Sequence, residues 1–210
     1  MIFTTQQFAE IDMALRRGRH ISRSEIGTYE FITQNFDEFE SFYAAYGTRL
    51  IQHPDGFFFL LAKGSLMPTR ILSRGVMHLG MFIAFKRRDP DLTRSDGRMS
   101  ISGLIQDLET SVPAETLAQV YAPKQRVSLE GERIHSEVMR VLKVLAELDF
   151  IETNGDQLTA NEAINRFAEL AKHSNAPTET AKIGLEIQRG VVFDIAEEEM
   201  TGEDDNDITD

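Results

Sequence analysis

The feature that most constrains this fold is a helix followed at once by a very short β-hairpin. From Glu130 to Leu148, apolar residues recur at spacings of three and four, which places them on one face of a helix. The segments FIET and QLTA then flank Asn154-Gly155, a dipeptide that favours a two-residue hairpin turn because both residues tolerate a positive φ angle. Two strands alone are unstable in water, so we expect this hairpin to pack against the helices.

The same pattern occurs a second time, in the first half of the chain. Ser24 to Tyr46 predicts a helix in two pieces that ends at Gly47, a residue suited to the left-handed conformation at helix ends. TRLIQH and FFFLLA then flank the turn tripeptide Pro54-Asp55-Gly56. A helical core that carries a hairpin, occurring twice, predicts a mainly α fold with small β-hairpins, built from tandem winged-helix domains.

The remaining periodic segments complete this organisation. The segment 74–88 is apolar almost all round, so we interpret it as a helix buried between domains or in a dimer interface. Further helices are expected at 101–110, 114–121 and 161–173. The predicted domains are an N-terminal one at 1–95 that includes a linking helix at about 73–88, a C-terminal one at 96–175, and a C-terminal segment at 176–210, with an exposed hinge at 88–98.

Charge and composition limit the possible function classes. The chain carries a net charge of −12, and nine acidic residues with no Lys or Arg lie between Asp194 and Asp210. Such a segment cannot bury a core, so it is either a solubilising tail or a strip that competes with phosphate for basic surfaces. The absence of cysteine fits a reducing cytosol, and no apolar run is long enough to span a bilayer. These features predict a cytoplasmic protein without a membrane contact.

No catalytic pattern is visible in the sequence. The histidines have no metal-ligand spacing, and the chain contains neither a G-x-x-x-x-G-K-[ST] loop nor a G-x-G-x-x-G motif. We therefore expect no enzyme activity, no bound metal and no cofactor. The five histidines are His20, His53, His78, His135 and His173.

The helix before the second hairpin is the candidate DNA-binding element, because the corresponding helix of helix-turn-helix folds normally enters the major groove. Its face opposite the apolar stripe is basic and polar, and two further bases precede the helix. The alternative interpretation is an ordinary solvated face. The candidate residues are Arg133, Ser136, Arg140 and Lys143, with Lys124 and Arg126 upstream.

The first unit differs in charge. Asp37, Glu38 and Glu40 on the helix before its hairpin would repel a phosphate backbone, so this unit is predicted to face a protein partner. Alternation along the strand places Phe57 and Phe59 on one face and Phe58 on the other. Part of this aromatic hairpin is therefore a candidate partner-facing surface, with burial of all three rings as the alternative.

A basic cluster follows the first predicted helix. We expect it to contact a phosphate group or an acidic partner; the alternative is that its charges only complement the negative end of their own helix. The cluster consists of Arg16, Arg17, Arg19, His20 and Arg23.

The chain resembles the MukE family, the small accessory subunits of bacterial MukBEF condensins. The resemblance covers roughly residues 8 to 170. It is carried by GRHIS in the first half, by the FY-x-AY pattern before the first hairpin and by the P-x-GFF-x-L pattern within it. In the second half it is looser, through the order helix, DFIETNGDQLT and RFA, followed by an acidic tail.

This resemblance implies a kleisin-interacting type of tandem winged-helix fold and a non-catalytic role in chromosome condensation and segregation. The implied partners are the kleisin MukF, the SMC ATPase MukB, a second copy of the chain, and double-stranded DNA held mainly within the complex at the nucleoid. The related MksE and plasmid-defence subunits fit as well. Two alternatives stay open: a winged-helix transcription regulator, favoured by the basic face, and a scaffold that binds the kleisin without touching DNA.

Overall fold

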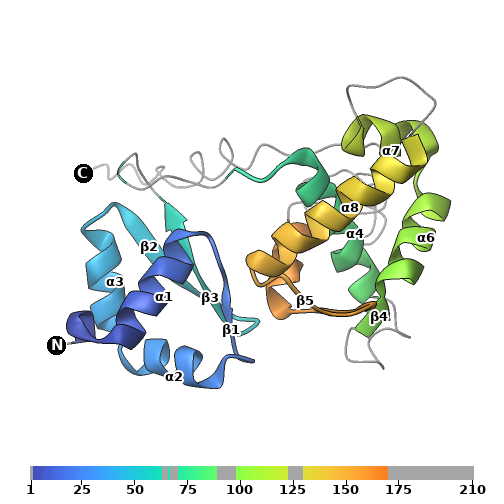
Figure 1. Ribbon diagram of the computed structural model, residues 1–210. Coiled ribbons are helices and arrows are strands. Elements are labelled where there is room, and N and C mark those ends of the chain that lie inside the picture. Colours follow the sequence, from blue (N-terminus) through green and yellow to red (C-terminus); the bar gives the residue numbers. More distant parts are fainter. Residues whose placement is uncertain (1, 63–65, 67–70, 89–97, 123–129, 170–210) are drawn as a thin grey trace, which may run out of the picture.

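The computed structural model describes residues 2–62, 66, 71–88, 98–122 and 130–169. These residues form two helical units, each with a small antiparallel sheet, and the units lie side by side (Figure 1). The predicted mainly α fold with small hairpins is confirmed. None of the described helices is long and apolar enough to cross a membrane.

The first unit is closed by a three-stranded sheet in the order β1-β3-β2. Thr5 begins α1 by accepting a hydrogen bond from the backbone N–H of Phe8, and Gly47 ends the helical part with a φ of 68°. Its elements are η1 (Ile2–Thr4), α1 (Gln6–Arg16), β1 (Ile21–Ser22), α2 (Ile26–Gln34), α3 (Phe36–Ala44), β2 (Thr48–His53) and β3 (Phe57–Ala62).

The second unit repeats this strand arrangement, with the sheet order β4-β6-β5. In both units a short strand, which follows the first helix of the unit and precedes the next helices, pairs with the last strand of the hairpin. The elements are α4 (Arg74–Arg87), β4 (Arg98–Ser100), α6 (Ile101–Ser111), α7 (Ala114–Tyr121), α8 (Glu130–Glu147), β5 (Ile151–Asn154), β6 (Gln157–Ala160), η3 (Glu162–Ile164) and α9 (Asn165–Glu169).

The turn of the second hairpin lies one residue later than predicted. Asn154 still pairs with Gln157 at the end of the strands, so Gly155 and Asp156 are the central residues. Gly155 has a φ of 60°, and glycine with positive φ at the first central position is typical of a type II′ turn. The reason for the shift is Asp156, whose carboxylate accepts from the N–H of Ser102 at 3.0 Å and from its hydroxyl at 2.8 Å at the start of α6.

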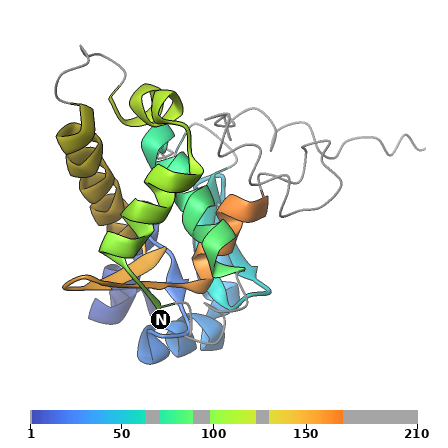
Figure 2. The ribbon, with the colours of Figure 1, turned by 90° about the vertical axis from the view of Figure 1, so that its right-hand side faces the viewer.

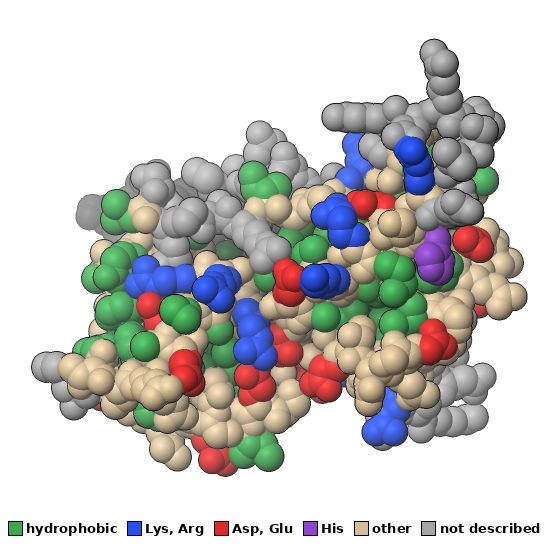
Figure 3. Space-filling model, viewed as in Figure 1, with side chains coloured by type: hydrophobic (Ala, Val, Ile, Leu, Met, Phe, Trp, Pro, Cys, Tyr) green, Lys and Arg blue, Asp and Glu red, His purple; other side chains and the backbone are tan. Residues whose placement is uncertain are grey.

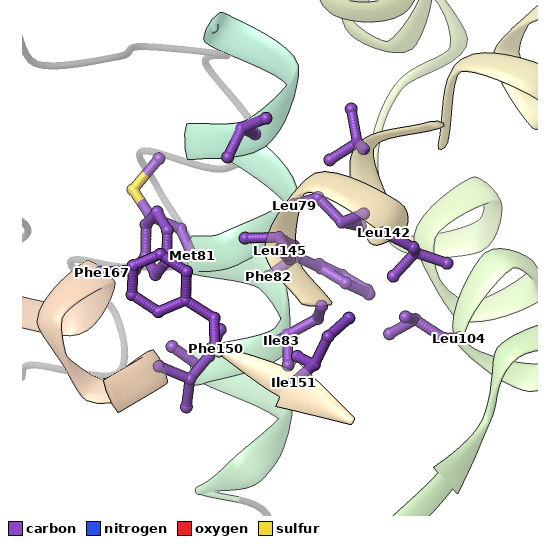
Figure 4. Packing of buried hydrophobic residues seen from close by; sticks show 14 of the residues in the cluster. Leu79, Met81, Phe82, Ile83, Leu104, Leu142, Leu145, Phe150, Ile151 and Phe167 are labelled. Atoms are coloured by element: carbon purple, nitrogen blue, oxygen red, sulfur yellow. The ribbon is translucent and has the colours of Figure 1, made fainter. Parts of the chain in front are cut away.

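Helix α4 packs as a core element of the second unit. Its residues from Gly75 to Ala84 are all buried, and the helix contacts α7, α8 and α9. Figure 4 shows the side chains of Leu79, Phe82 and Ile83 from α4 gathered with those of Leu142 and Leu145 from α8. The helix is apolar all round because elements of the second unit cover it on several sides. We predicted a linking helix at the end of the N-terminal domain, whereas α4 packs in the core of the second unit.

Close approach between α4 and α9 depends on a glycine. A Cβ atom at Gly80 would lie 2.6 Å from the ring of Phe167, which is closer than van der Waals contact allows. This glycine lets the ring of Phe167 pack directly on the backbone of α4, next to Phe150 at a ring-centroid distance of 4.7 Å. Glycine in the middle of a helix is therefore used here for packing.

Candidate nucleic-acid and partner surfaces

Helix α8 presents the predicted polar face to solvent. Its apolar stripe, which includes Val138, Val141 and Leu145, is buried. Arg133, Ser136, Arg140 and Lys143 are exposed. The helix lies at the front of Figure 1 and at the left edge of Figure 2, so one of its sides is uncovered in both views. The two upstream candidates, Lys124 and Arg126, lie outside the described residues.

This face carries less positive charge than its bases suggest. Arg140 donates to both carboxylate oxygens of Glu137, with an Nε–Oε2 distance of 2.9 Å. The same bond lowers the pKa of Glu137 and raises that of Arg140, so both groups stay charged and neutralise each other. Figure 3 accordingly shows Lys and Arg side chains spread over the molecule with acidic ones between them. Arg133 and Lys143 are left as the main candidates for phosphate contact.

The helix before the first hairpin is acidic at its surface, as predicted. Asp37, Glu38 and Glu40 on α3 are all exposed. No Lys, Arg or His occurs between Ser24 and Gly47. A phosphate backbone would be repelled along this whole helical segment, whereas α8 exposes bases such as Arg133 and Lys143 beside acidic residues.

The aromatic hairpin does not offer an exposed surface. Phe57 and Phe58 are fully buried and Phe59 is 9% exposed. Phe58 packs in the core of the first unit, whereas Phe57 and Phe59 belong to the core cluster of the second. The predicted alternation is therefore correct, but the hypothesis of a partner-facing wing at these residues is wrong, because the second unit of the same chain covers the outward face.

The basic cluster after α1 is divided between several intramolecular contacts. Arg16 forms an ion pair with Asp12, at an Nε–Oδ1 distance of 2.6 Å, and its guanidinium lies 4.7 Å from the ring centre of Tyr46. Arg23 lies across the first hairpin turn, where a Cβ atom on Gly56 would be 2.3 Å from its Nε. Arg17 is an exposed residue.

The other two members of the cluster point into the boundary between the units. Arg19 pairs with Glu25 at 3.0 Å and approaches Asp149 at 3.9 Å. His20 is only 2% exposed and bonds to the carbonyl oxygen of Leu148. The structure therefore does not bring the five residues together into one binding surface.

Asp149 is the residue at this boundary that sequence reasoning missed. Its carboxylate is buried and accepts a hydrogen bond from Ser22, with an Oγ–Oδ2 distance of 2.8 Å. The one available signal is that a charged residue stands between Leu148 and Phe150, directly after the last helical turn, where glycine or asparagine is usual. That signal does not reveal that the partner is Ser22, in the other unit.

Burial shifts the pKa values of both boundary groups. Desolvation, helped by the guanidinium of Arg166, lowers the pKa of His20 to about 3. Desolvation also raises the pKa of Asp149 to about 6, with smaller increases from Glu25 and Glu152 and a decrease from the Ser22 hydrogen bond. His20 is therefore neutral at physiological pH, and its Nδ1–H donates to Leu148 while Nε2 accepts from Arg166.

Within the described ranges, no group of three or more His, Asp and Glu side chains could hold a metal ion.

Comparison with known proteins gives consistent matches over most of the chain. The family model described as condensin complex protein MksE matches residues 6–172. The chromosome partition protein MukE of Actinobacillus succinogenes is 25% identical over 96% of this chain and 85% of its own length. MukE of Haemophilus influenzae is 28% identical over 82% of this chain and 74% of its own length. MukE of Vibrio cholerae is 29% identical over 76% of this chain and 71% of its own length.

Proposed function

The chain belongs to the MksE family of condensin complex proteins, and on this premise we propose that it is a non-catalytic accessory subunit of a MukBEF-type SMC complex. Its task in that complex is chromosome condensation and partition. The observation that carries the proposal is the family match across residues 6–172, which covers both helix-hairpin units. The chain acts by binding other macromolecules, in the cytoplasm and at the nucleoid.

Each of the two units is a winged-helix domain. The order of strand, helices and hairpin, and the pairing of the first strand with the last, support this assignment in both halves. The packing of α4 supports a domain boundary between Ala62 and Arg74. The first domain then comprises the elements from η1 to β3, and the second comprises those from α4 to α9, ahead of the acidic C-terminal segment.

The two domains bind different kinds of partner, according to the charge of their exposed helices. Helix α8 carries the exposed bases Arg133 and Lys143, so the second domain contributes to holding double-stranded DNA. The acidic helix α3 excludes DNA from the first domain, which leaves that domain for protein partners. With a net charge of −12, the isolated subunit binds DNA weakly, and its contribution counts within the assembled complex.

The protein partners follow from the family. They are a MukF-like kleisin, a MukB-like ATPase that supplies the nucleotide chemistry, and a second copy of this chain in a homodimer. The test is co-expression with the kleisin and the coiled-coil ATPase of the same organism, followed by purification on the kleisin and determination of the mass of the complex. We expect about two copies of this chain for each kleisin, consistent with a two-fold symmetric dimer. Absence of this chain from the purified complex would refute the proposal.

A transcription regulator is the second candidate, favoured by the exposed bases of α8. A regulator of this kind binds one operator tightly at physiological salt. We expect no protected site in a footprint over genomic fragments, and weak binding to every duplex that falls steeply as salt is raised. One strongly protected sequence would instead support regulation.

A further inference from the structure

We infer that His20 and Asp149 are positioning residues: each is inserted into the opposite unit, and together they fix the orientation of the α8 face relative to the first unit. We call this pair, with its partners Ser22, Leu148 and Arg166, the interlock. The interpretation of the α8 face as DNA-binding rests on the proposed function. The interlock does not depend on that function, because it is argued from contacts within the chain.

The first half of the interlock runs from the first unit into the second. The backbone N–H of His20 donates to the carbonyl oxygen of Leu148 at 3.1 Å, and the ring Nδ1 binds the same oxygen at 3.0 Å. On the other side of the ring, Nε2 accepts from Arg166 at 2.8 Å. The ring also lies 4.3 Å from that of Phe150, measured between centroids. His20 is thus held on several sides by residues of the second unit.

The second half runs in the opposite direction. Asp149 adopts a left-handed conformation, with a φ of 63°, at the point where α8 ends and β5 is about to begin. This turn directs its carboxylate into the first unit, where it accepts from Ser22 at 2.8 Å, while Asn161 of its own unit donates to the other oxygen at 3.2 Å. A left-handed non-glycine residue is uncommon and costs free energy, so the surrounding contacts must hold it.

Apolar contacts between the units surround these polar ones. Hairpin β2–β3 lies between the two cores, with Phe58 on one side and Phe57 and Phe59 on the other. The guanidinium of Arg166 lies 3.9 Å from the ring centre of Phe59. Asp55, at the tip of the same hairpin, accepts a hydrogen bond at 2.9 Å from the side-chain amide of Asn165 on α9. The hairpin is thereby held on both faces.

Reciprocal insertion resists sliding and rotation, which a flat apolar contact alone does not. Any rotation of one unit against the other breaks the His20–Leu148 and Ser22–Asp149 bonds together and leaves buried polar groups without partners. The α8 face and the acidic face of α3 are therefore held in one fixed relation. A protein bound on the first unit and a duplex bound on the second keep a constant separation.

The test measures the distance between the units in the full-length protein. The chain contains no cysteine, so two introduced cysteines are the only sites that a thiol-reactive nitroxide can label. We place them at the exposed positions Gln34→Cys on α2 and Gln119→Cys on α7, and measure the distance between the two labels by double electron-electron resonance. We expect a single narrow distance. Asp149→Gly permits the left-handed conformation without strain but lacks the carboxylate, so it should lose that single distance and give a broad distribution.

Two further variants separate positioning from general stability. Asp149→Asn tolerates the left-handed conformation and can still accept from Ser22, so it should restore the narrow distribution. Glu152→Ala removes an exposed carboxylate nearby and should leave the distribution unchanged. Ser22→Ala, a milder change than Asp149→Gly, should broaden it in a fully folded protein.

The inference is overturned if Asp149→Gly and Ser22→Ala both remain folded by circular dichroism and keep the wild-type distance distribution. It is equally overturned if Asp149→Asn broadens the distribution as much as Asp149→Gly, because the effect then follows from charge and not from the inserted hydrogen bond. Neither outcome depends on DNA, a kleisin or an ATPase, so failure here leaves the proposed function standing.

Discussion

The hydroxyl of Ser22 donates a hydrogen bond to the carboxylate of Asp149 across 127 positions of sequence, at an Oγ–Oδ2 distance of 2.8 Å. The bond joins the start of the first sheet to the end of the longest described helix. It links two halves that each have their own strands and helices. Local sequence patterns shape the halves, and contacts such as this one decide how the halves meet.

Asp149 should make stability fall as pH rises. Its folded pKa of about 6 exceeds the ordinary aspartate pKa of 3.8, so its stabilising protonation is complete below pH 3.8 and is lost as pH rises through 6. Asp149→Asn cannot ionise and keeps the hydrogen-bond acceptor, so it should exceed the wild type in unfolding free energy by about 1–3 kcal/mol at pH 8. Urea titrations at pH 5 and pH 8 measure this, and a variant less stable than wild type at pH 8 would contradict it.

His20 should have the opposite pH dependence. Its folded pKa of about 3 lies below the ordinary histidine pKa of 6.5, so its contribution to stability is present above pH 6.5 and is lost as pH falls toward 3. In the Asp149→Asn background this loss is no longer offset, and unfolding free energy should fall by up to about 1.4 kcal/mol for each pH unit below 6. Adding His20→Phe should flatten that profile. A slope that persists after His20→Phe would assign it to another group.

Two glycine-to-alanine substitutions should change stability in opposite directions. At Gly80 a new Cβ would lie 2.6 Å from the ring of Phe167, so Gly80→Ala should destabilise by about 1–3 kcal/mol despite the gain in helix propensity. At Gly27 nothing lies within 4 Å of the new atom, so Gly27→Ala on α2 should stabilise by about 0.5–1 kcal/mol. Thermal melts compare the pair, and equal effects at both sites would show that contact with Phe167 is not limiting.

Charge reversal on α8 should weaken DNA loading by the complex. Arg133→Glu with Lys143→Glu reverses two exposed bases of α8. Within the part of the chain that the structure describes, neither base forms an ion pair like the one between Arg140 and Glu137. We expect fewer phosphate contacts and a salt dependence reduced by about two contacts. Arg49→Glu with Arg74→Glu, at exposed positions of β2 and α4, gives the same net charge and serves as the control. Unchanged DNA loading in the α8 variant would favour a scaffold that does not touch DNA.

Local signals predicted most of the secondary structure. Helix periodicity and turn residues placed β2, β3 and β6 at their observed bounds, because a hairpin is specified by a few adjacent residues. The turn at Gly155 is displaced by one residue because Asp156 is used by α6, a contact between segments far apart in sequence. Local patterns carry no information on such a contact.

The surface roles were harder to predict for the same reason. The exposure of Arg133 and Lys143 followed from the helical period, which is local. The burial of Phe57 and Phe59 depends on where the second unit packs, and the inward direction of His20 depends on the carbonyl of Leu148. The sequence of a basic loop is the same whether the loop contacts a partner protein or another part of its own chain. The same holds for an aromatic hairpin.

The placement of hairpin β2–β3 between two cores has a consequence for dissecting the protein. A fragment cut after Ala62 would leave the rings of Phe57 and Phe59 facing water, and the complementary fragment would open the apolar flank around Phe150 and Phe167. Both pieces would be prone to aggregation. Although the halves look like duplicated modules, both of their cores pack against hairpin β2–β3, so the halves have to be expressed as one polypeptide.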